Sequence, residues 1–219
     1  MRISLFCSDK EHPVNEHLKR WIAAQKGIHQ VDLIRKKSEL SSGDILFLIS
    51  CSEIITTVER SAYRATLVLH ASDLPRGRGW SPHVWEIIDG ADEITLCLLE
   101  AEDKVDSGRI WKKLKFPVPR HALWDEINVR LFDAEIELIN FSINEFERIC
   151  PIAQDPKIEP TYYPLRSPAD SQIDPSQSIA SQFNRIRVCD PNRFPAFFEL
   201  HGKKYKMILE KLDEQTHQY

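Results

Sequence analysis

The sequence lacks any apolar run long enough to cross a membrane. A transmembrane helix needs about 20 consecutive apolar residues, whereas the longest unbroken apolar stretch, at 45–49, is only strand-sized. The N-terminal residues MRISLFCSDKEH also hold too short an apolar segment for a secretory signal. We therefore expect a cytoplasmic protein with no membrane partner.

An excess of positive charge is also missing. The chain has 219 residues, with 29 Lys and Arg against 33 Asp and Glu, a net charge of -4. Proteins that bind DNA or RNA usually present a basic face, so we expect no nucleic-acid partner. Two locally basic runs, at 112–115 and 203–206, are interpreted as solvated edges.

Closely spaced cysteines are absent as well. The five cysteines are an odd number and lie far apart, without the short spacing of a zinc knuckle or a redox pair. We expect them to be buried free thiols in a reducing compartment. No cluster of ligand residues indicates a metal site, so no metal is expected.

Strand and helix patterns alternate through the first two thirds of the chain. Apolar runs with strand character occur at 1–7, 31–34, 45–49, 67–69 and 93–100. Helical patterns occur at 13–22, 53–60, 82–88 and 122–150. This alternation predicts an α/β, Rossmann-like fold with a mainly parallel sheet, and we assign it to one domain at 1–150.

Residues 151–219 are expected to form a small C-terminal extension. Pro, Asp and Ser are frequent from Pro151 to about Pro175, which indicates an irregular connection. A helix is predicted at 178–188. Two short strand-like runs within 194–209, joined at His201 and Gly202, predict a β-hairpin.

The stretch LVLHASDLPRGRGWSP places His70 at the end of a predicted strand and follows it with a loop rich in turn residues. Ligands in parallel sheets bind beyond the carboxyl ends of the strands, so this position favours a functional role. The stretch EAEDKVDSG follows the fifth strand and places Asp106 beside a glycine turn at Gly108. If the two side chains meet, the carboxylate would raise the imidazole pKa and fix its tautomer, which suits proton transfer. The competing interpretations are a structural histidine and a solvated acidic loop.

These motifs, in this order, resemble the 10-formyltetrahydrofolate-dependent formyltransferase family, whose best-known members act on methionyl-tRNA. That family has an Asn-x-His-Pro-Ser-x-Leu-Pro segment, a following helix, and a loop that ends Asp-x-Gly. The resemblance covers about residues 1–111 and implies that residues 1–150 are a formyltransferase catalytic domain. It implies catalytic roles for His70 and Asp106, with Ser72 as a further candidate.

The resemblance also implies that 10-formyltetrahydrofolate is the formyl donor. Its folate ring is expected between the loop after Ile49 and the loop 100–105. The residues expected to bind it are Ser50, Cys51, Ser52, Leu74, Glu100, Ala101, Asp103 and Val105.

Two positions depart from the family pattern. Ala71 replaces the usual proline, a mild change, and Val68 replaces the asparagine that holds the formyl oxygen. Loss of one such donor typically costs about 10²–10³ in rate. Either another group supplies the hydrogen bond, or the enzyme is slow, or the chain is a non-catalytic module. The donors considered are a backbone N–H after His70 and the hydroxyls of Ser72, Ser50 and Ser52.

The tail of the chain resembles formyltransferases that act on nucleotide-linked amino sugars. The matching residues are Arg166, Pro168, Asp170, Ile173 and Asp174, then Asn184, Ile186 and Arg187, then Pro195, Phe197 and Phe198. The stretch HASDLPRGRGWSPHVWEI is similar to enzymes that formylate a UDP-linked 4-amino sugar, in pseudaminic acid pathways. The residues expected to contact the acceptor are Arg76, Gly79, Trp80, Ser81, Pro82 and Arg187.

Further functions stay open on the sequence alone. Arg187 and Arg185 can equally be surface residues of a helix instead of diphosphate ligands. A methionyl-tRNA formyltransferase would share the motifs but usually has a longer, more basic C-terminal domain. A formyltetrahydrofolate hydrolase and a non-catalytic formyltransferase-like module are also compatible with the motifs. A homodimer is compatible with the sequence, which does not determine the oligomeric state.

Overall fold

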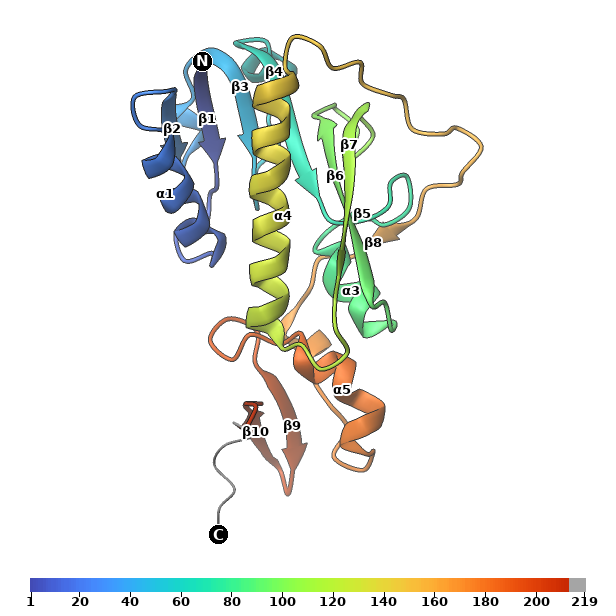
Figure 1. The fold of residues 1–219 in the computed structure, drawn as a ribbon. Helices are drawn as coiled ribbons and strands as arrows, with labels where there is room; N and C mark the ends of the chain where they lie inside the picture. Colours follow the sequence, from blue (N-terminus) through green and yellow to red (C-terminus); the bar gives the residue numbers. More distant parts are fainter. Residues whose placement is uncertain (213–219) are drawn as a thin grey trace.

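The computed structural model describes residues 1–212 and is built around a six-stranded sheet (Figure 1). Its strands lie in the order β2-β1-β3-β4-β6-β7. Their bounds are β1 Arg2–Phe6, β2 Gln30–Ile34, β3 Gly43–Leu48, β4 Tyr63–His70, β6 Glu93–Glu100 and β7 Ile110–Pro117. Strands β2, β1, β3 and β4 are parallel to one another, and β6 is antiparallel to both β4 and β7. This is the mainly parallel α/β architecture that the sequence predicts.

Two long helices lie side by side over one face of this sheet (Figure 1). They are α1, Val14–Gln25, and α4, Trp124–Glu145. The apolar stripe of α4 is buried at Ile127, Leu131 and Leu138. Helix α4 ends at Glu145, before the predicted residue 150, and residues 146–148 form a turn. The shorter helices are α2 Thr57–Arg60, α3 Pro82–Ile88, α5 Ile179–Arg187, η1 Lys37–Glu39 and η2 Pro168–Ser171.

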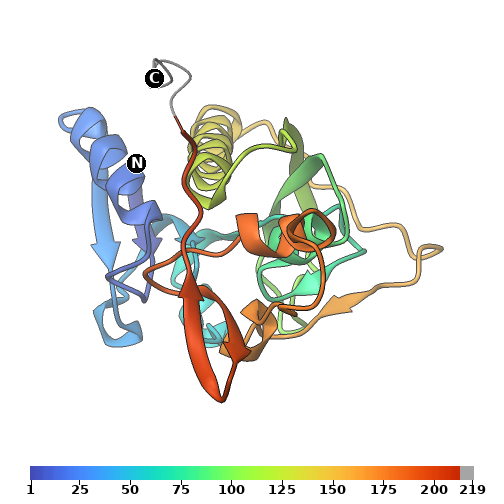
Figure 2. The same ribbon diagram turned by 90° about the horizontal axis from the view of Figure 1, so that it is seen from below.

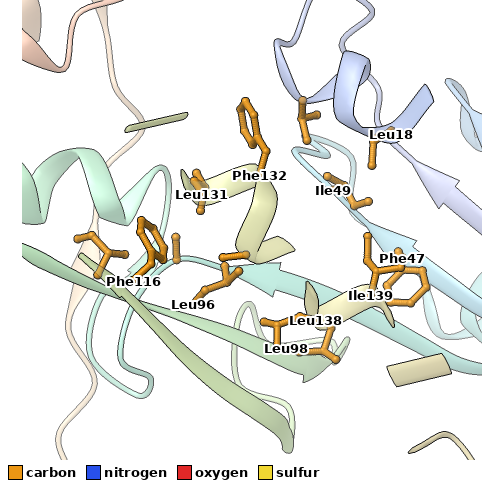
Figure 3. Close-up of a cluster of buried hydrophobic side chains, with 14 of the residues drawn as sticks. Leu18, Phe47, Ile49, Leu96, Leu98, Phe116, Leu131, Phe132, Leu138 and Ile139 are labelled. Carbon is orange, nitrogen blue, oxygen red and sulfur yellow. The ribbon is translucent and has the colours of Figure 1, made fainter. Parts of the chain in front are cut away.

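The main core lies between the sheet and these two helices (Figure 3). Leu18 of α1, Phe47 of β3, Leu98 of β6 and Leu138 of α4 all point into it. A continuous apolar run such as 45–49 has this role because its strand is covered on both faces. The packed core fixes the strand ends from which the candidate site is built.

One carboxyl group is buried in this region. Glu135 of α4 is buried, its Oε2 has no hydrogen-bond partner in the described residues, and burial raises its pKa to about 8. Between the ordinary value of 4.5 and about 8, the folded protein holds a proton that the unfolded chain has released. The free energy of unfolding should therefore fall as the pH rises through this window.

Replacing this carboxyl by an amide should remove that pH dependence. In Glu135→Gln we expect the slope of the unfolding free energy between pH 5 and 8, roughly 1.4 kcal/mol per pH unit, to be largely lost. The free energy of unfolding of the variant should thus increase relative to that of the wild type as the pH rises. Glu137→Gln, on the exposed side of the same helix, is the matched control. Denaturant titrations at pH 5 and pH 8 test this, and parallel curves for wild type and Glu135→Gln would contradict it.

The edge strand β7 has no counterpart in the sequence prediction. Trp111 and Phe116 near its two ends are buried, and Lys113 and Lys115 between them are exposed, so from the sequence this stretch resembles only a basic run. Lysines on an edge strand discourage pairing with other chains. The run 112–115 is therefore a solvated edge, as expected, within an unexpected strand.

The helix predicted at 53–60 is shorter in the structure. It begins only after Thr56, whose hydroxyl accepts a hydrogen bond from the backbone N–H of Glu59. The Glu59 side chain accepts in return from the N–H of Thr56, which completes a capping box. This cap sets the start of α2 and leaves residues 53–56 as part of a loop.

Helix α5 and residues 196–207 lie below the carboxyl ends of the parallel strands in Figure 1. The predicted hairpin is present as β9, Ala196–Leu200, and β10, Lys203–Met207, which pair antiparallel. A short strand β8, Tyr162–Tyr163, pairs in parallel with β5, Arg78–Gly79, in the loop after β4 (Figure 2). The connection after Pro151 therefore contacts the first part of the chain closely. Residues 213–219 of the expected extension lie outside the described residues, and no described helix is long and apolar enough to span a membrane.

Candidate active site

The candidate site lies where strands β1, β3 and β4 end together. The sheet order reverses between β1 and β3, because β2 lies on one side of β1 and β3 lies on the other. Loops that leave such a switch point form the usual ligand crevice of an open α/β sheet. Here they are residues 7–13, 49–56 and 71–81.

The structure brings His70 and Asp106 together at this edge. His70 Nδ1 lies 3.5 Å from Asp106 Oδ2, and both side chains are buried, with exposed fractions of 6% and 8%. The antiparallel register sets Cys97 of β6 opposite His70 and the end of β6 beside Leu67, so the loop after β6 folds back along β4 to bring Asp106 to the imidazole. This pair is the centre of the site.

Both ring nitrogens of His70 are engaged. Nε2 lies 2.9 Å from the carbonyl oxygen of Gly77, which can only accept a hydrogen bond, so Nε2 carries a proton. Nδ1 faces Asp106, whose Oδ2 also accepts a 2.9 Å hydrogen bond from the N–H of Gly79. The Gly77 carbonyl therefore fixes the tautomer, and Nδ1 is the nitrogen that can take up or release a proton.

The backbone around Asp106 is held by a residue that sequence reasoning missed. The amide of Gln154 donates to the carbonyls of Asp106 and Gly108, at 2.8 Å and 3.0 Å. Its oxygen accepts a 2.7 Å hydrogen bond from buried Arg78. No motif marks Gln154, because a lone glutamine in an irregular connection carries no sequence signal. The C-terminal connection thus helps to position the carboxylate.

Backbone strain is concentrated near this edge. Within residues 1–212, four residues other than glycine have a left-handed φ, and three of them are Ser50, Ser81 and Asp106, in the loops after β3, β4 and β6. Such conformations cost on the order of 1–3 kcal/mol and are often found at functional sites. The fourth, His201, lies in the turn of the C-terminal hairpin.

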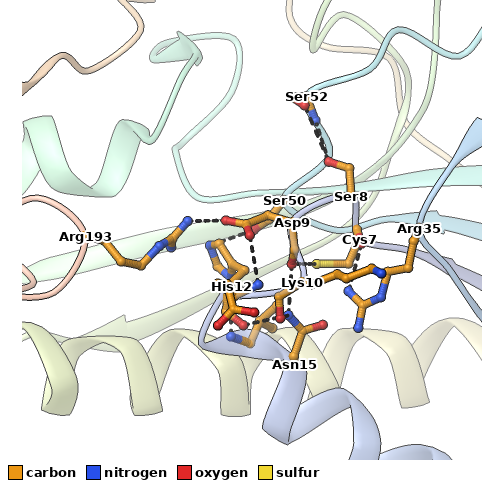
Figure 4. Close-up of polar contacts among 12 residues, drawn as sticks. Cys7, Ser8, Asp9, Lys10, His12, Asn15, Arg35, Ser50, Ser52 and Arg193 are labelled. Atoms are coloured by element: carbon orange, nitrogen blue, oxygen red, sulfur yellow. Dashed lines mark hydrogen bonds and ion pairs between the residues drawn. The ribbon is translucent and has the colours of Figure 1, made fainter.

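A polar cluster occupies the switch point itself (Figure 4). Ser50 Oγ lies 3.1 Å from His12 Nε2, and Asp9 pairs with Arg193 of the C-terminal part. Burial, followed by the positive charge of Arg193, lowers the pKa of His12 to about 4, so this imidazole is neutral at pH 7. Sequence reasoning missed His12, because it is not part of either motif.

The loop 100–105, expected to hold a folate, is bonded to helix α2, which follows the other expected loop, 49–56. Thr57 Oγ1 donates to Asp103 Oδ1 at 2.9 Å, and Arg60 pairs with the same carboxylate. That pairing, first by the hydrogen bond from Arg60, lowers the pKa of Asp103. Apolar side chains are exposed on both loops: Ile54 is 74% exposed and Val105 is 53% exposed. A flat, partly apolar ring would find suitable surfaces there.

The other residues expected to bind the folate lie partly in the loop after β3 and partly beside a surface hollow. Cys51 donates to the carbonyl of Glu53, and burial raises the pKa of its thiol to about 11. Ser52 is exposed and its N–H contacts Ser8 Oγ. Ala101 and Glu100 line a surface hollow of about 540 Å³ that also includes Trp111 and Phe146. The Glu100 carboxylate is bonded to Arg109 and Trp111 beside that hollow.

Most of the residues expected to contact the acceptor substrate lie on the loop between β4 and α3. Gly79 is bonded to Asp106, and the loop then continues through Trp80 and Ser81. Trp80 is 42% exposed, and Arg76 and Ser81 are also exposed. Pro82 is buried at the start of α3, so it shapes this loop from inside.

Two expected site residues are structural instead. Ser72 is fully buried and its hydroxyl donates to the carbonyl of Arg76, so it is not free to hold a substrate oxygen. Leu74 is 2% exposed and packs against Cys97 and Leu99, which leaves no surface for a cofactor. Both residues support the loop that follows His70.

Arg187 is also corrected by the structure. Its guanidinium is 1% exposed and donates to the carbonyls of Pro119 and Ala122 and to the side chain of Asn184. It therefore ties α5 to the turn before α4 and presents almost no surface to a diphosphate. Residue type suggests a phosphate ligand, but an arginine can equally satisfy buried carbonyls.

Replacing this arginine should affect stability and not substrate binding. In Arg187→Met, two carbonyls lose their partner, at a cost of about 1–3 kcal/mol each. We expect a lower Tm and an unchanged KM for the acceptor. Arg185→Gln, an exposed change on the same helix, should leave both quantities unchanged. Thermal unfolding and steady-state kinetics test this. A raised KM with an unchanged Tm would mean that Arg187 binds the acceptor, as the sequence predicts.

Metal ligands do not gather in the part of the chain that the structure describes. No three side chains of His, Cys, Asp or Glu within residues 1–212 are arranged to hold an ion. The histidines near the site are His70, which is bonded to Gly77, and His12, which contacts Ser50.

Comparisons with known proteins agree on one family. A family model described as Formyl transferase matches residues 5–142. Methionyl-tRNA formyltransferase of Synechococcus sp. (strain JA-3-3Ab) is 26% identical over 173 residues, which is 78% of this chain and 52% of that protein. The chain thus spans about half the length of the curated relatives that it matches.

Solved structures with the same fold include methionyl-tRNA and sugar formyltransferases. Methionyl-tRNA formyltransferase from Clostridium thermocellum superposes with a TM-score of 0.81 at 20% identity, over 98% of this chain and 95% of that chain. WlaRD, a sugar 3N-formyl transferase crystallised in the presence of dTDP and 5-N-formyl-THF, gives a TM-score of 0.66 at 13% identity. That match covers 86% of this chain and 78% of the WlaRD chain. At these identities the likeness shows the fold.

Proposed function

This chain belongs to the formyl transferase family, and we propose that it moves a formyl group from 10-formyltetrahydrofolate to the amine of a nucleotide-linked amino sugar. The observation that carries the proposal is the buried pair of His70 and Asp106 at the carboxyl edge of the sheet. A carboxylate beside an imidazole with one fixed tautomer is suited to taking a proton from an attacking amine.

The proposed proton path uses only these two side chains. Asp106 accepts the proton that the amine loses as its nitrogen forms a bond with the formyl carbon. Once Asp106 holds this proton, it can share it with the unprotonated Nδ1 of His70, 3.5 Å away. Asp106 then passes this proton to the folate nitrogen N10 when the bond between N10 and the formyl carbon breaks. Atoms and charge therefore balance without a metal or a redox partner.

The residues present fit a folate. Exposed Ile54 and Val105 offer apolar contacts from two loops that Thr57 and Asp103 hold together. When bound, the folate supplies the activated one-carbon unit, and these loops would orient it toward Asp106. A related structure obtained with 5-N-formyl-THF supports this assignment.

The sugar acceptor is supported by the motifs in the tail and by the charge of the chain. Exposed Trp80 and Arg76 lie on the loop that leads away from His70, where they can contact a nucleotide-linked sugar. The net charge of -4 does not favour a polyanion such as tRNA. Within this class we favour a UDP-linked 4-amino sugar, of the kind formed in pseudaminic acid pathways.

Methionyl-tRNA is the second candidate acceptor. The observation in its favour is that the curated relatives are described as methionyl-tRNA formyltransferases. The catalytic pair would serve either amine, so the acceptor must be decided by experiment.

The decisive experiment measures tetrahydrofolate release from 10-formyltetrahydrofolate with each acceptor in turn. UDP-linked and dTDP-linked 4-amino sugars are compared with methionyl-tRNA and with no acceptor. His70→Ala should abolish turnover, and His121→Ala, an exposed change, should not. Release of tetrahydrofolate that requires an amino sugar supports the proposal. Release that requires methionyl-tRNA identifies the second candidate as the acceptor instead. Release without an acceptor indicates a hydrolase, and no release at all indicates a non-catalytic module.

A further inference from the structure

The loop that carries Asp106 is held in a strained conformation from outside. Asp106 has a left-handed φ of +53°, a conformation that is unfavourable for a residue with a side chain. Two residues on, Gly108 packs so closely against the carbonyl oxygen of Glu100 that no side chain fits there. The carbonyls of Asp106 and Gly108 both accept hydrogen bonds from the side-chain amide of Gln154, at 2.8 Å and 3.0 Å. Gln154 therefore clamps the strained turn on both sides of its bend.

Gln154 reaches this turn because the connection after α4 is anchored on either side of it. Before Gln154, the backbones of Ile152 and Ile110 exchange two hydrogen bonds, of 2.7 Å and 2.9 Å. After it, the carbonyl of Thr161 accepts a 2.9 Å hydrogen bond from the N–H of Arg78, where the connection meets β5 (Figure 1). The position of Gln154 is thus set by backbone pairing with both loops of the site.

Arg78 fixes the orientation of the Gln154 amide. Its side chain is only 5% exposed, and its closest acceptor in residues 1–212 is the Gln154 amide oxygen, at 2.7 Å, followed by the Tyr162 hydroxyl at 3.3 Å. A guanidinium has only donors, so the amide oxygen must face Arg78 and both amide N–H bonds must point to the two carbonyls. Arg78 itself lies between the two glycines whose backbone groups bind His70 and Asp106. The contact between Arg78 and Gln154 therefore joins the two loops that carry the pair.

We propose that Arg78 and Gln154 are positioning residues, which hold the Asp106 carboxylate where it can take the proton of the attacking amine. This inference rests on the proposed function, because it assigns the support of the proposed base. Both side chains act through backbone carbonyls and through each other, and neither bonds to the side chain of His70 or Asp106. A displacement of about 1 Å in such a group can cost about 10²-fold in rate. The connection after α4 is thus part of the catalytic machinery and sets kcat without contacting a substrate.

Gln154→Glu separates positioning from stability. A carboxylate keeps an acceptor for Arg78 and adds the opposite charge, but it cannot donate to the two carbonyls. We expect kcat to fall about 10–100-fold, while the KM values for donor and acceptor and the Tm stay close to those of the wild type. Lys157→Ala, an exposed change in the same connection, is the matched control and should leave all of them unchanged. A wild-type kcat in Gln154→Glu, or a loss that appears only where the variant unfolds, would overturn the proposal.

A paired substitution tests the donors themselves. Arg78→Met removes the group that orients the amide and should lower kcat by a similar factor. Adding Gln154→Lys to Arg78→Met places an ammonium group, which has three donors, beside the same two carbonyls and restores one buried positive charge. We expect kcat to rise again by about 3–10-fold over Arg78→Met alone. An unchanged kcat in Arg78→Met would remove Arg78 from the proposal.

Amide hydrogen exchange provides a readout that does not depend on turnover. The N–H of Gly79 donates to Asp106 Oδ2, so its exchange rate reports how often the carboxylate leaves its place. In Gln154→Glu we expect this amide to exchange about 10-fold faster than in the wild type. The amide of Ile49, bonded to a neighbouring strand, should not change. Equal exchange of Gly79 in both proteins would refute the role of Gln154. A wild type that transfers no formyl group to any acceptor contradicts the proposed function, and the exchange rate then decides separately whether Gln154 holds Asp106.

Discussion

Asp106→Asn is expected to lower kcat by about 10²–10⁴, the usual contribution of a positioned acid or base. The substitution removes the charge beside His70 Nδ1 and with it the group that takes the proton of the amine. The amide oxygen can still accept the hydrogen bond from Gly79, so the loop should keep its conformation. The measurement is kcat at saturating donor and acceptor, together with Tm.

Asp103→Asn is the matched control for this prediction. It changes an exposed carboxylate on the same loop, whose partners are Arg60 and Thr57 and not the histidine. We expect kcat to stay within a few-fold of wild type, with any change confined to the KM for the folate. Comparable losses of kcat in both variants would mean that the whole loop is sensitive and that the pair of His70 and Asp106 has no special role.

Gly108→Ala is expected to reduce both stability and turnover. A Cβ at this position would lie 1.9 Å from the carbonyl oxygen of Glu100, so the loop that carries Asp106 must move. Crowding of this kind costs about 1–3 kcal/mol, or roughly 2–10 °C in Tm for a chain of this size. Because Asp106 lies only two residues away, its approach to His70 should be lost and kcat should fall strongly.

Gly90→Ala separates the two effects. Gly90 has a left-handed φ of +103° but open space around it, in a turn after α3. Alanine there is disfavoured by its backbone conformation alone, so Tm should fall while kcat stays unchanged. If Gly108→Ala behaved in the same way, the close contact with Glu100 would have no part in positioning the carboxylate.

The sequence was most informative where local pattern and position agree. The apolar run at 45–49 predicted a strand covered on both faces, and β3 is such a strand. The turn-rich stretch after His70 indicated a rigid loop, and the hydrogen bonds of Gly77 and Gly79 provide that rigidity. Both predictions succeeded because the signal lies within a few consecutive residues.

The sequence was least informative where a role depends on a distant partner. Its residue type and its place in the tail predict that Arg187 binds phosphate, but it is buried against carbonyls from a turn more than 60 residues away. Leu74 lies in a functional motif and is nevertheless a packing residue. A side chain of a given type can serve several partners, and only the fold determines which of them is near.

By itself, the sequence determined the α/β class, the strand that carries His70 and the loop that carries Asp106, because periodicity and turn residues act locally. Only the tertiary structure decided that these side chains meet, that Gln154 holds the second loop, and that His12 borders the same edge. Their approach depends on the antiparallel return of β6 beside β4 and on a connection that crosses back to the strand ends. Such long-range pairings are stabilised by the folded core as a whole, and no short segment encodes them.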